Sequence, residues 1–210
     1  MDGNLFIKIA RAAYSIAERP HNFKSYLSSQ FSTPLSLGLP WISYPAIDFL
    51  ERYLRPEMDV FEFGSGGSTV YFSSRVGSVT AVEEDAKWAT LVEAELKKRA
   101  LRNASVLRSN WNSKAGPGGF LQSDYLTHLQ SKFDIILIDG MCFHPSEPLR
   151  PFCFDKAKLH LKPNGIIVMD DSWRYKDLVN QDKWFSETIF KGLGPCRPGV
   201  TTTTIYSSKT

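Results

Sequence analysis

The sequence lacks the features of several common classes of protein. Its three cysteines, Cys142, Cys153 and Cys196, lie far apart and form no C-x-x-C pair, so the spacing indicates neither a zinc site nor a disulfide framework. It has no uninterrupted run of about 18 apolar residues, the length needed to cross a bilayer. Lys8 and Arg11 break the N-terminal apolar stretch, which is therefore not typical of a signal peptide. We expect a cytoplasmic protein without a membrane span.

An excess of charge of one sign is also absent. Lys and Arg number 25 and Asp and Glu number 22, which gives a formal net charge of +3. The chain has no dense Lys/Arg stripe of the kind that nucleic-acid-binding proteins carry, so a small-molecule partner is favoured over nucleic acid. The small positive charge can help an anionic substrate to approach. With 210 residues, the chain is long enough for one domain with its own core and an extension.

Apolar runs alternate with helical patterns over most of the chain, which predicts a parallel sheet covered by helices. The segment 200–207 is β-branched and polar and predicts a C-terminal edge strand. Residues 1–55 are expected to form an N-terminal helical extension that supplies substrate specificity or homodimer contacts, and residues 56–210 a doubly wound, mostly parallel α/β domain. The predicted strands are 60–63, 78–82, 104–108, 133–138 and 166–169, and the predicted helices include 5–18, 46–54 and 149–161.

A glycine-rich turn follows the first apolar run. The segment 60–69 reads VFEFGSGGST, a strand that leads into Gly64 and Gly66 and then opens a helix. Glycines remove the Cβ atoms that would hold a ligand away from the backbone, and the free N–H groups at the helix start point towards an anionic group. Glu83 ends the next strand roughly 20 residues further on, where a carboxylate can accept both ribose hydroxyls. The pattern predicts a nucleotide-like ligand.

Two cofactor classes share this arrangement. The NAD pattern G-x-G-x-x-G fails at its third glycine, where Thr69 stands. Glu62 lies on the strand just before the turn, and a carboxylate suits an α-ammonium group better than a phosphate. The residues favour S-adenosylmethionine and leave NAD open.

The chain resembles the class I S-adenosylmethionine-dependent methyltransferases. Their first motif is an acidic residue, any residue, and then glycines at alternate positions. The segment 62–66 (EFGSG) matches it, with Ser68 in place of the third alternate glycine. Glu83 resembles the family's ribose-binding acid, 133–140 (FDIILIDG) its fourth-strand motif, and 161–171 its fifth. The resemblance covers about residues 56 to 207 and implies a Rossmann-like fold, S-adenosylmethionine as cofactor, and methyl transfer.

The resemblance also implies a set of cofactor-binding residues. Asn110 follows the third strand, where the family commonly has a polar residue near the adenine, and Trp111 can stack on the ring. The alternative for Asn110 is a loop residue that bonds its own backbone. The expected cofactor-binding residues are Glu62, Gly64, Ser65, Gly66, Ser68, Thr69, Glu83, Asn110, Trp111 and Asp139.

Three aspartates follow neighbouring strands: Asp139 follows the fourth, and Asp170 and Asp171 follow the fifth. We expect them at one edge of the sheet, where open α/β sheets bind ligands. One hypothesis is a Mg²⁺ site made of these three carboxylates, which resembles the metal-dependent O-methyltransferases. The alternative is that Asp171 caps a helix and Asp139 fixes a loop. Asp139, Asp170 and the loop histidine His144 are the candidate catalytic residues.

The acceptor is expected to be an oxygen of a small molecule. An Asn/Asp-Pro-Pro-aromatic tetrad, typical of enzymes that methylate nitrogen in DNA, is absent after the fourth strand, where residues 138–141 read IDGM. Trp41 and Tyr44 are candidates for a lid and Trp173 and Tyr175 for an acceptor pocket, with ordinary packing as the alternative. The alternative functions are an NAD-dependent oxidoreductase and a non-catalytic cofactor-binding module.

Overall fold

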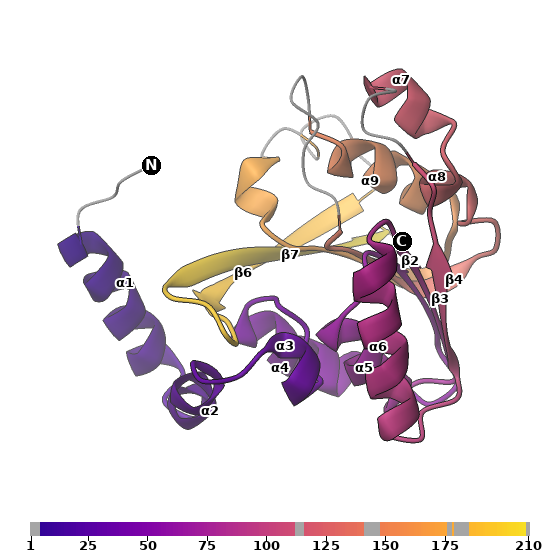
Figure 1. Ribbon diagram of the computed structural model, residues 1–210. Helices are drawn as coiled ribbons and strands as arrows, with labels where there is room; N and C mark the ends of the chain where they lie inside the picture. The colour runs from indigo at the N-terminus through magenta and orange to yellow at the C-terminus, as the bar shows by residue number, and fades with distance from the viewer. Residues whose placement is uncertain (1–4, 112–115, 141–147, 176–177, 179–184, 209–210) are drawn as a thin grey trace.

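The computed structural model describes residues 5–111, 116–140, 148–175, 178 and 185–208, with side chains described from residue 10. Within these ranges, seven strands form one sheet in the order β3-β2-β1-β4-β5-β7-β6 (Figure 1). In chain order the strands are β1 Asp59–Phe63, β2 Ser78–Glu83, β3 Ala104–Arg108, β4 Phe133–Ile138, β5 Leu161–Met169, β6 Phe185–Leu193 and β7 Val200–Ser208.

Helices cover both faces of the sheet (Figure 1). The α-helices are α1 Leu5–Glu18, α2 Asn22–Ser29, α3 Pro34–Leu37, α4 Tyr44–Tyr53, α5 Gly67–Ser73, α6 Ala86–Lys98, α7 Gly116–Leu121, α8 Asp124–Thr127 and α9 Arg150–Leu159, and a 3₁₀ turn, η2, spans Ser172–Arg174. In the described part of the chain, none of these helices has the length and apolar character needed to span a membrane.

The strand order reverses beside β1. The first five strands pair in parallel, and β1 pairs with β2 on one side and with β4 on the other. The chain thus winds outwards to β3, crosses back, and continues from β4. This reversal is the place where open α/β sheets bind ligands. The predicted doubly wound, mostly parallel sheet is confirmed.

The two central strands are buried on both faces. In β1, Phe61 and Phe63 contribute to one apolar cluster and Val60 to another; in β4, Ile136 contributes to the first cluster and Leu137 to the second. Helices α8 and α9 cover the first cluster, and α4 and α5 cover the second. Burial on both faces explains why these strands appear in the sequence as continuous apolar runs.

The segment before β1 packs against the C-terminal hairpin. The backbone N–H of Leu193 donates to Ser15 Oγ (3.1 Å), which ties β6 to α1. Ser43 donates from its N–H to Thr203 Oγ1 (3.0 Å) and from its hydroxyl to the carbonyl of Phe190 (2.9 Å). The stretch 31–45 is rich in Ser, Pro and Gly, a composition that predicts a loop, but it contains the short helix α3 and the start of α4.

The C-terminal strand predicted at 200–207 is present as β7, and it lies one place inside the sheet edge. It pairs antiparallel with β5 on one side and with β6 on the other, so β6 is the outermost strand. The sequence of β6, FSETIFKGL, carries polar and charged side chains between its apolar ones, and its residues Ser186–Ile189 are exposed. This strand therefore offers no continuous apolar run from which it could be predicted.

Candidate active site

A cavity of about 400 Å³ lies at the carboxyl ends of β1, β2, β4 and β5. Its walls are the glycine turn after β1, the ends of the other three strands, α6, the segment from α3 to Trp41, and the turn between β6 and β7. The predicted residues that line it are Gly64, Ser65, Gly66, Ser68, Glu83, Asp139, Asp170 and Asp171. The fold thus brings the glycine turn, the expected ribose-binding acid and all three aspartates to one place.

The three glycines of the turn have different roles. Gly64 has a φ of +96°, and a Cβ there would lie 2.6 Å from the Cα of Gly140, so this glycine lets the ends of β1 and β4 approach each other. A Cβ on Gly67 would lie 2.2 Å from the carbonyl oxygen of Leu39. Only Gly66 has room for a Cβ, which would lie in ordinary van der Waals contact with the Trp88 ring at 3.7 Å. Gly66 is therefore the glycine whose missing side chain leaves room in the cavity.

Glu83 holds the glycine turn from the end of β2. Its Oε2 accepts hydrogen bonds from the N–H and the hydroxyl of Ser65, both at 2.9 Å, and its Oε1 accepts from the N–H of Asp85 at 3.0 Å. The side chain is buried at the cavity wall. A carboxylate has about four lone-pair sites, so these three bonds leave acceptor capacity for a ligand.

Trp88 forms the wall beside Glu83, which the sequence did not predict. Trp88 recurs with Leu91, Val92 and Leu96 at helical spacing, which predicts one apolar face of the helix, but Trp88 is 36% exposed and Leu91 is 55% exposed. The Trp88 indole N–H donates to the carbonyl of Ser65 at 2.8 Å, which fixes the ring beside the turn. The cavity therefore has a flat aromatic wall next to its ribose-binding candidate.

Glu62 lies behind the cavity wall and does not line it. Its side chain is fully buried and accepts hydrogen bonds from the hydroxyls of Ser68 and Thr69, while Oε1 has no hydrogen-bond partner among the described residues. Burial raises the pKa of Glu62 to about 8. Thr69 also stays behind the wall, where its hydroxyl accepts from the N–H of Gly66 (3.0 Å). Glu62 and Thr69 therefore hold the glycine turn by hydrogen bonds from behind the cavity wall.

Asp139 and Asp170 line the cavity, and the pKa of each carboxyl group is raised. Burial, followed by mutual repulsion of the negative charges, raises the pKa of Asp170, and burial is also the main cause of the raised pKa of Asp139. Asp170 accepts hydrogen bonds from Thr203 (2.9 Å) and Arg197 (3.3 Å). Asp139 pairs with Arg150 at 3.3 Å. Carboxyl groups of this kind can exchange a proton near neutral pH.

Arg150 joins the ends of two strands. It is buried and donates to the backbone carbonyls of Asp139 (2.7 Å), Gly140 (3.0 Å) and Asp170 (2.6 Å). These bonds hold the ends of β4 and β5 together beneath the cavity. The backbone carbonyls that it binds lie 10 to 20 residues away in the chain, so no motif in the sequence signals its role.

The Mg²⁺ hypothesis is not supported. Within the described ranges, no group of three or more His, Cys, Asp or Glu side chains is arranged to hold a metal ion. Each of the three predicted ligands pairs with an arginine: Asp139 with Arg150, and both Asp170 and Asp171 with Arg197. Guanidinium groups supply the positive charge that a cation would supply.

The predicted adenine residues make their contacts with other parts of the chain. The backbone N–H of Asn110 donates to the carboxylate of Asp124 at 3.0 and 3.1 Å, and the side chain is exposed. Trp111 packs edge-on against Phe120, with ring centroids 5.2 Å apart. Neither lines the cavity. His144 lies outside the described residues, so its predicted role stays a prediction.

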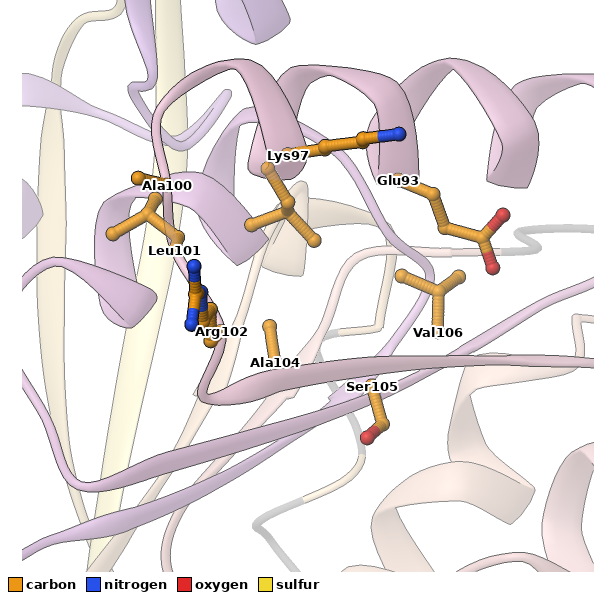
Figure 2. A pocket seen from close by; sticks show the side chains of 9 residues that line it. Glu93, Lys97, Ala100, Leu101, Arg102, Ala104, Ser105 and Val106 are labelled. Carbon is orange, nitrogen blue, oxygen red and sulfur yellow. The ribbon is translucent and has the colours of Figure 1, made fainter.

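A second and larger cavity is a weaker candidate for the functional site. It measures about 750 Å³ and lies between α6 and the edge strand β3. Figure 2 shows its side chains coming from the helix, the connecting turn and the strand, with Ala104 and Val106 on the side of the helix and Ser105 turned away. It has no set of converging polar groups comparable to the carboxylates at the strand ends.

Comparison with known proteins gives matches by structure only; neither a family model nor a curated protein sequence matches the chain. An O-methyltransferase from Bacillus cereus, in complex with S-adenosylhomocysteine (SAH), aligns with a TM-score of 0.65 at 17% identity and covers 95% of this chain and 99% of its own. The O-methyltransferase TomG from Streptomyces achromogenes, in complex with S-adenosylmethionine, aligns with a TM-score of 0.63 at 15% identity, with coverages of 97% and 99%.

A third structure has a different acceptor in its name. An rRNA methylase from Streptococcus thermophilus aligns with a TM-score of 0.59 at 12% identity and covers 81% of this chain and 100% of its own. Methyltransferases for different acceptors thus share this architecture, so the likeness speaks for the fold and not for the acceptor. The chain has the Rossmann-like fold of the class I S-adenosylmethionine-dependent methyltransferases, as its motifs predicted.

Proposed function

We propose that the protein is an S-adenosylmethionine-dependent methyltransferase that acts on an oxygen of a small-molecule acceptor. The observation that carries the proposal is the meeting, at one cavity, of the turn that Glu83 holds and the pair of aspartates Asp139 and Asp170. One end of the cavity can hold a nucleoside, and the other end can accept a proton.

The residues at the nucleoside end suit this cofactor. Glu83 has acceptor capacity for ribose hydroxyls, Gly66 lines the cavity without a side chain, and the Trp88 ring offers an apolar face. When bound, S-adenosylmethionine supplies a methyl group carried on a positively charged sulfur. Ser65 donates both its N–H and its hydroxyl to Glu83, which holds that carboxylate in place.

The aspartates supply the acid–base chemistry at the other end. Because burial raises the pKa of Asp170, its carboxylate is a stronger base than an exposed aspartate and takes a proton from a hydroxyl near neutral pH. Thr203 and Arg197 orient it. Asp139 lies close enough to raise the pKa of Asp170 through its charge. The carboxyl groups lie inside a cavity of about 400 Å³ rather than on an open face, which favours a small acceptor.

The test is turnover with a panel of hydroxyl-bearing acceptors and of acceptors that offer only nitrogen, measured as production of S-adenosylhomocysteine. Asp170→Asn should lower the rate by about 100-fold or more, because the general base is lost while the shape is kept. Asp155→Asn, in which an exposed aspartate of α9 is changed, is the control and should leave the rate unchanged. Methylation of nitrogen acceptors alone would contradict the proposed acceptor class, and an Asp170→Asn protein with the wild-type rate would contradict the role of the base.

A further inference from the structure

Two arginines lie at the acceptor end of the cavity, and the proposed methyl transfer uses only one contact of one of them, the bond by which Arg197 orients Asp170. Arg174 lies on η2, just after β5, and Arg197 lies on the turn between β6 and β7. Both line the cavity, and both contact the same carboxylate, that of Asp171. Nothing in the proposed chemistry requires two positive charges at this place.

Asp171 holds the two guanidinium groups on either side of one oxyanion. Arg197 Nη1 lies 3.4 Å from Oδ1, and Arg174 Nη2 lies 3.1 Å from Oδ2. The Thr201 hydroxyl also donates to Oδ1 at 3.1 Å. Asp171 has a φ of +50°, in the left-handed region that few non-glycine residues adopt and that aspartate adopts more readily than most. The arrangement already accommodates one carboxylate between the arginines.

Arg197 is held in place and still has donors for a ligand. Its guanidinium stacks over the ring of Trp41 at 4.7 Å, and the backbone of its turn is tied to α2 by the bond from the N–H of Cys196 to Ser29 Oγ (3.1 Å). Its bonds to Asp170 and Asp171, at 3.3 and 3.4 Å, are longer than the usual range of about 2.7 to 3.2 Å. A guanidinium carries five N–H donors, so a better placed oxyanion can compete for this side chain.

The charge balance at this end favours an anion. Asp139, Asp170 and Asp171 face Arg150, Arg174 and Arg197, so the end is neutral only if every carboxyl group is ionised. Burial and mutual repulsion work against full ionisation of Asp139 and Asp170, and once Asp170 has taken the proton of the acceptor hydroxyl the three arginines leave a net positive charge at this end.

We infer that the acceptor carries an oxyanion, a carboxylate or a phosphate, beside the hydroxyl that is methylated, and that Arg174 and Arg197 bind it. The inference rests on the proposed function of the same cavity and adds the chemical class of the substrate. A bidentate oxyanion matches the planar guanidinium, which makes arginine the suitable residue for this recognition.

The experiment is a calorimetric titration of the full-length protein, with and without saturating S-adenosylhomocysteine. The probes are 4-hydroxybenzoate, 4-hydroxyphenyl phosphate, and the uncharged methyl ester of 4-hydroxybenzoate. Either anion should bind at least about tenfold more tightly than the ester, and whichever anion binds more tightly identifies the source of the oxyanion.

The variants distinguish binding of the anion by Arg174 and Arg197 from a general effect of the net charge of the protein. Arg197→Gln and, independently, Arg174→Gln should each reduce the preference for the anion by at least about fivefold. Because Arg174 is the more exposed of the two, its variant keeps the test valid if Arg197→Gln fails to fold. Arg102→Gln removes the same charge from the exposed edge hollow and should keep the full preference.

Two results would overturn the inference. One is that no anion binds more tightly than the ester, including the case in which no probe binds. The other is that the preference survives in both the Arg174 and the Arg197 variants. In either case, binding of S-adenosylhomocysteine would leave the proposed function standing. Failure to bind S-adenosylhomocysteine would refute the proposed cofactor, while the probes would still report on the arginines.

Discussion

Replacement of Glu83 by glutamine tests whether this carboxylate accepts hydrogen bonds from the ribose hydroxyls of the cofactor. Glu83 accepts from the N–H and hydroxyl of Ser65 through one oxygen and from the N–H of Asp85 through the other. Glutamine keeps the shape of the side chain and one acceptor oxygen, but its amide nitrogen is a donor. Whichever way the amide turns, one side of Glu83 faces a donor that it can no longer satisfy.

The magnitude follows from the loss of the charge. A hydrogen bond to a charged group contributes about 1.5 to 3 kcal/mol and one between neutral groups about 0.5 to 1.5 kcal/mol, so each bond to a ribose hydroxyl weakens by on the order of 1 kcal/mol. With two hydroxyls, and an amide nitrogen that cannot accept from one of them, we expect a loss of about 1 to 3 kcal/mol. This corresponds to about a 5- to 150-fold weaker affinity.

The assay is calorimetric titration with S-adenosylhomocysteine after thermal unfolding has shown that the variant is folded. Glu93→Gln is the matched control: Glu93 lies on α6, is paired with Arg108, and is remote from the glycine turn. The control should bind within about twofold of wild type, a difference below roughly 0.5 kcal/mol. A folded Glu83→Gln protein with wild-type affinity would refute the assignment of the ribose to this carboxylate.

Three further predictions concern the turn and the buried acids. Gly66→Ala should fold with nearly wild-type stability and bind S-adenosylhomocysteine at least about tenfold more weakly. Gly64→Ala should lower the free energy of unfolding by at least about 3 kcal/mol, because Gly64 has a positive φ and a Cβ there would meet backbone atoms. Equal unfolding midpoints for the two variants would contradict this. Glu62 keeps its proton up to a pH of about 8 when folded and loses it near 4.5 when unfolded, so the free energy of unfolding should fall by about 3 to 5 kcal/mol as the pH rises through this window. Urea unfolding at both ends of the window checks this, and Glu62→Gln should make the dependence smaller by this amount, leaving the part that the raised pKa values of Asp139 and Asp170 contribute. The raised pKa of Asp170 predicts that methyl transfer speeds up as the pH rises through neutrality; a flat profile would contradict its role as base.

The central strands could be predicted because burial on both faces leaves a local record in the sequence. Strand β4 has the bounds that its apolar run predicted, 133–138, and the run predicted at 60–63 lies within β1. The glycine turn and Glu83 were also predictable, since a strand, a turn and a helix that follow one another in the chain fix their relative positions.

Strand β6 and Arg197 could not be predicted, because both depend on contacts between distant segments. The polar face of β6 is tolerated at the sheet edge, where only one side of the strand pairs. The hairpin of β6 and β7 then brings Arg197 back to Asp170, 27 residues earlier in the chain. The sequence does not show that Arg197 pairs with Asp170 and Asp171, so the positions of the aspartates suggested metal ligands.

The position of Trp88 shows the limit of helical periodicity. Asp85 caps α6 and accepts from the N–H of Trp88 at 3.1 Å, so this residue belongs to the first turn of the helix. Its indole reaches the carbonyl of Ser65 instead of the sheet. Periodicity describes the face that packs on the sheet, and a side chain at the helix start can leave that face for a neighbouring loop.

The most direct test of the proposed function is calorimetric titration of the wild-type protein with S-adenosylhomocysteine and, in parallel, with NAD⁺. The account predicts micromolar or tighter binding of S-adenosylhomocysteine and no binding of NAD⁺, because Glu62 and Thr69 replace the features that a pyrophosphate requires. Binding of NAD⁺ without S-adenosylhomocysteine, or of neither, would contradict it.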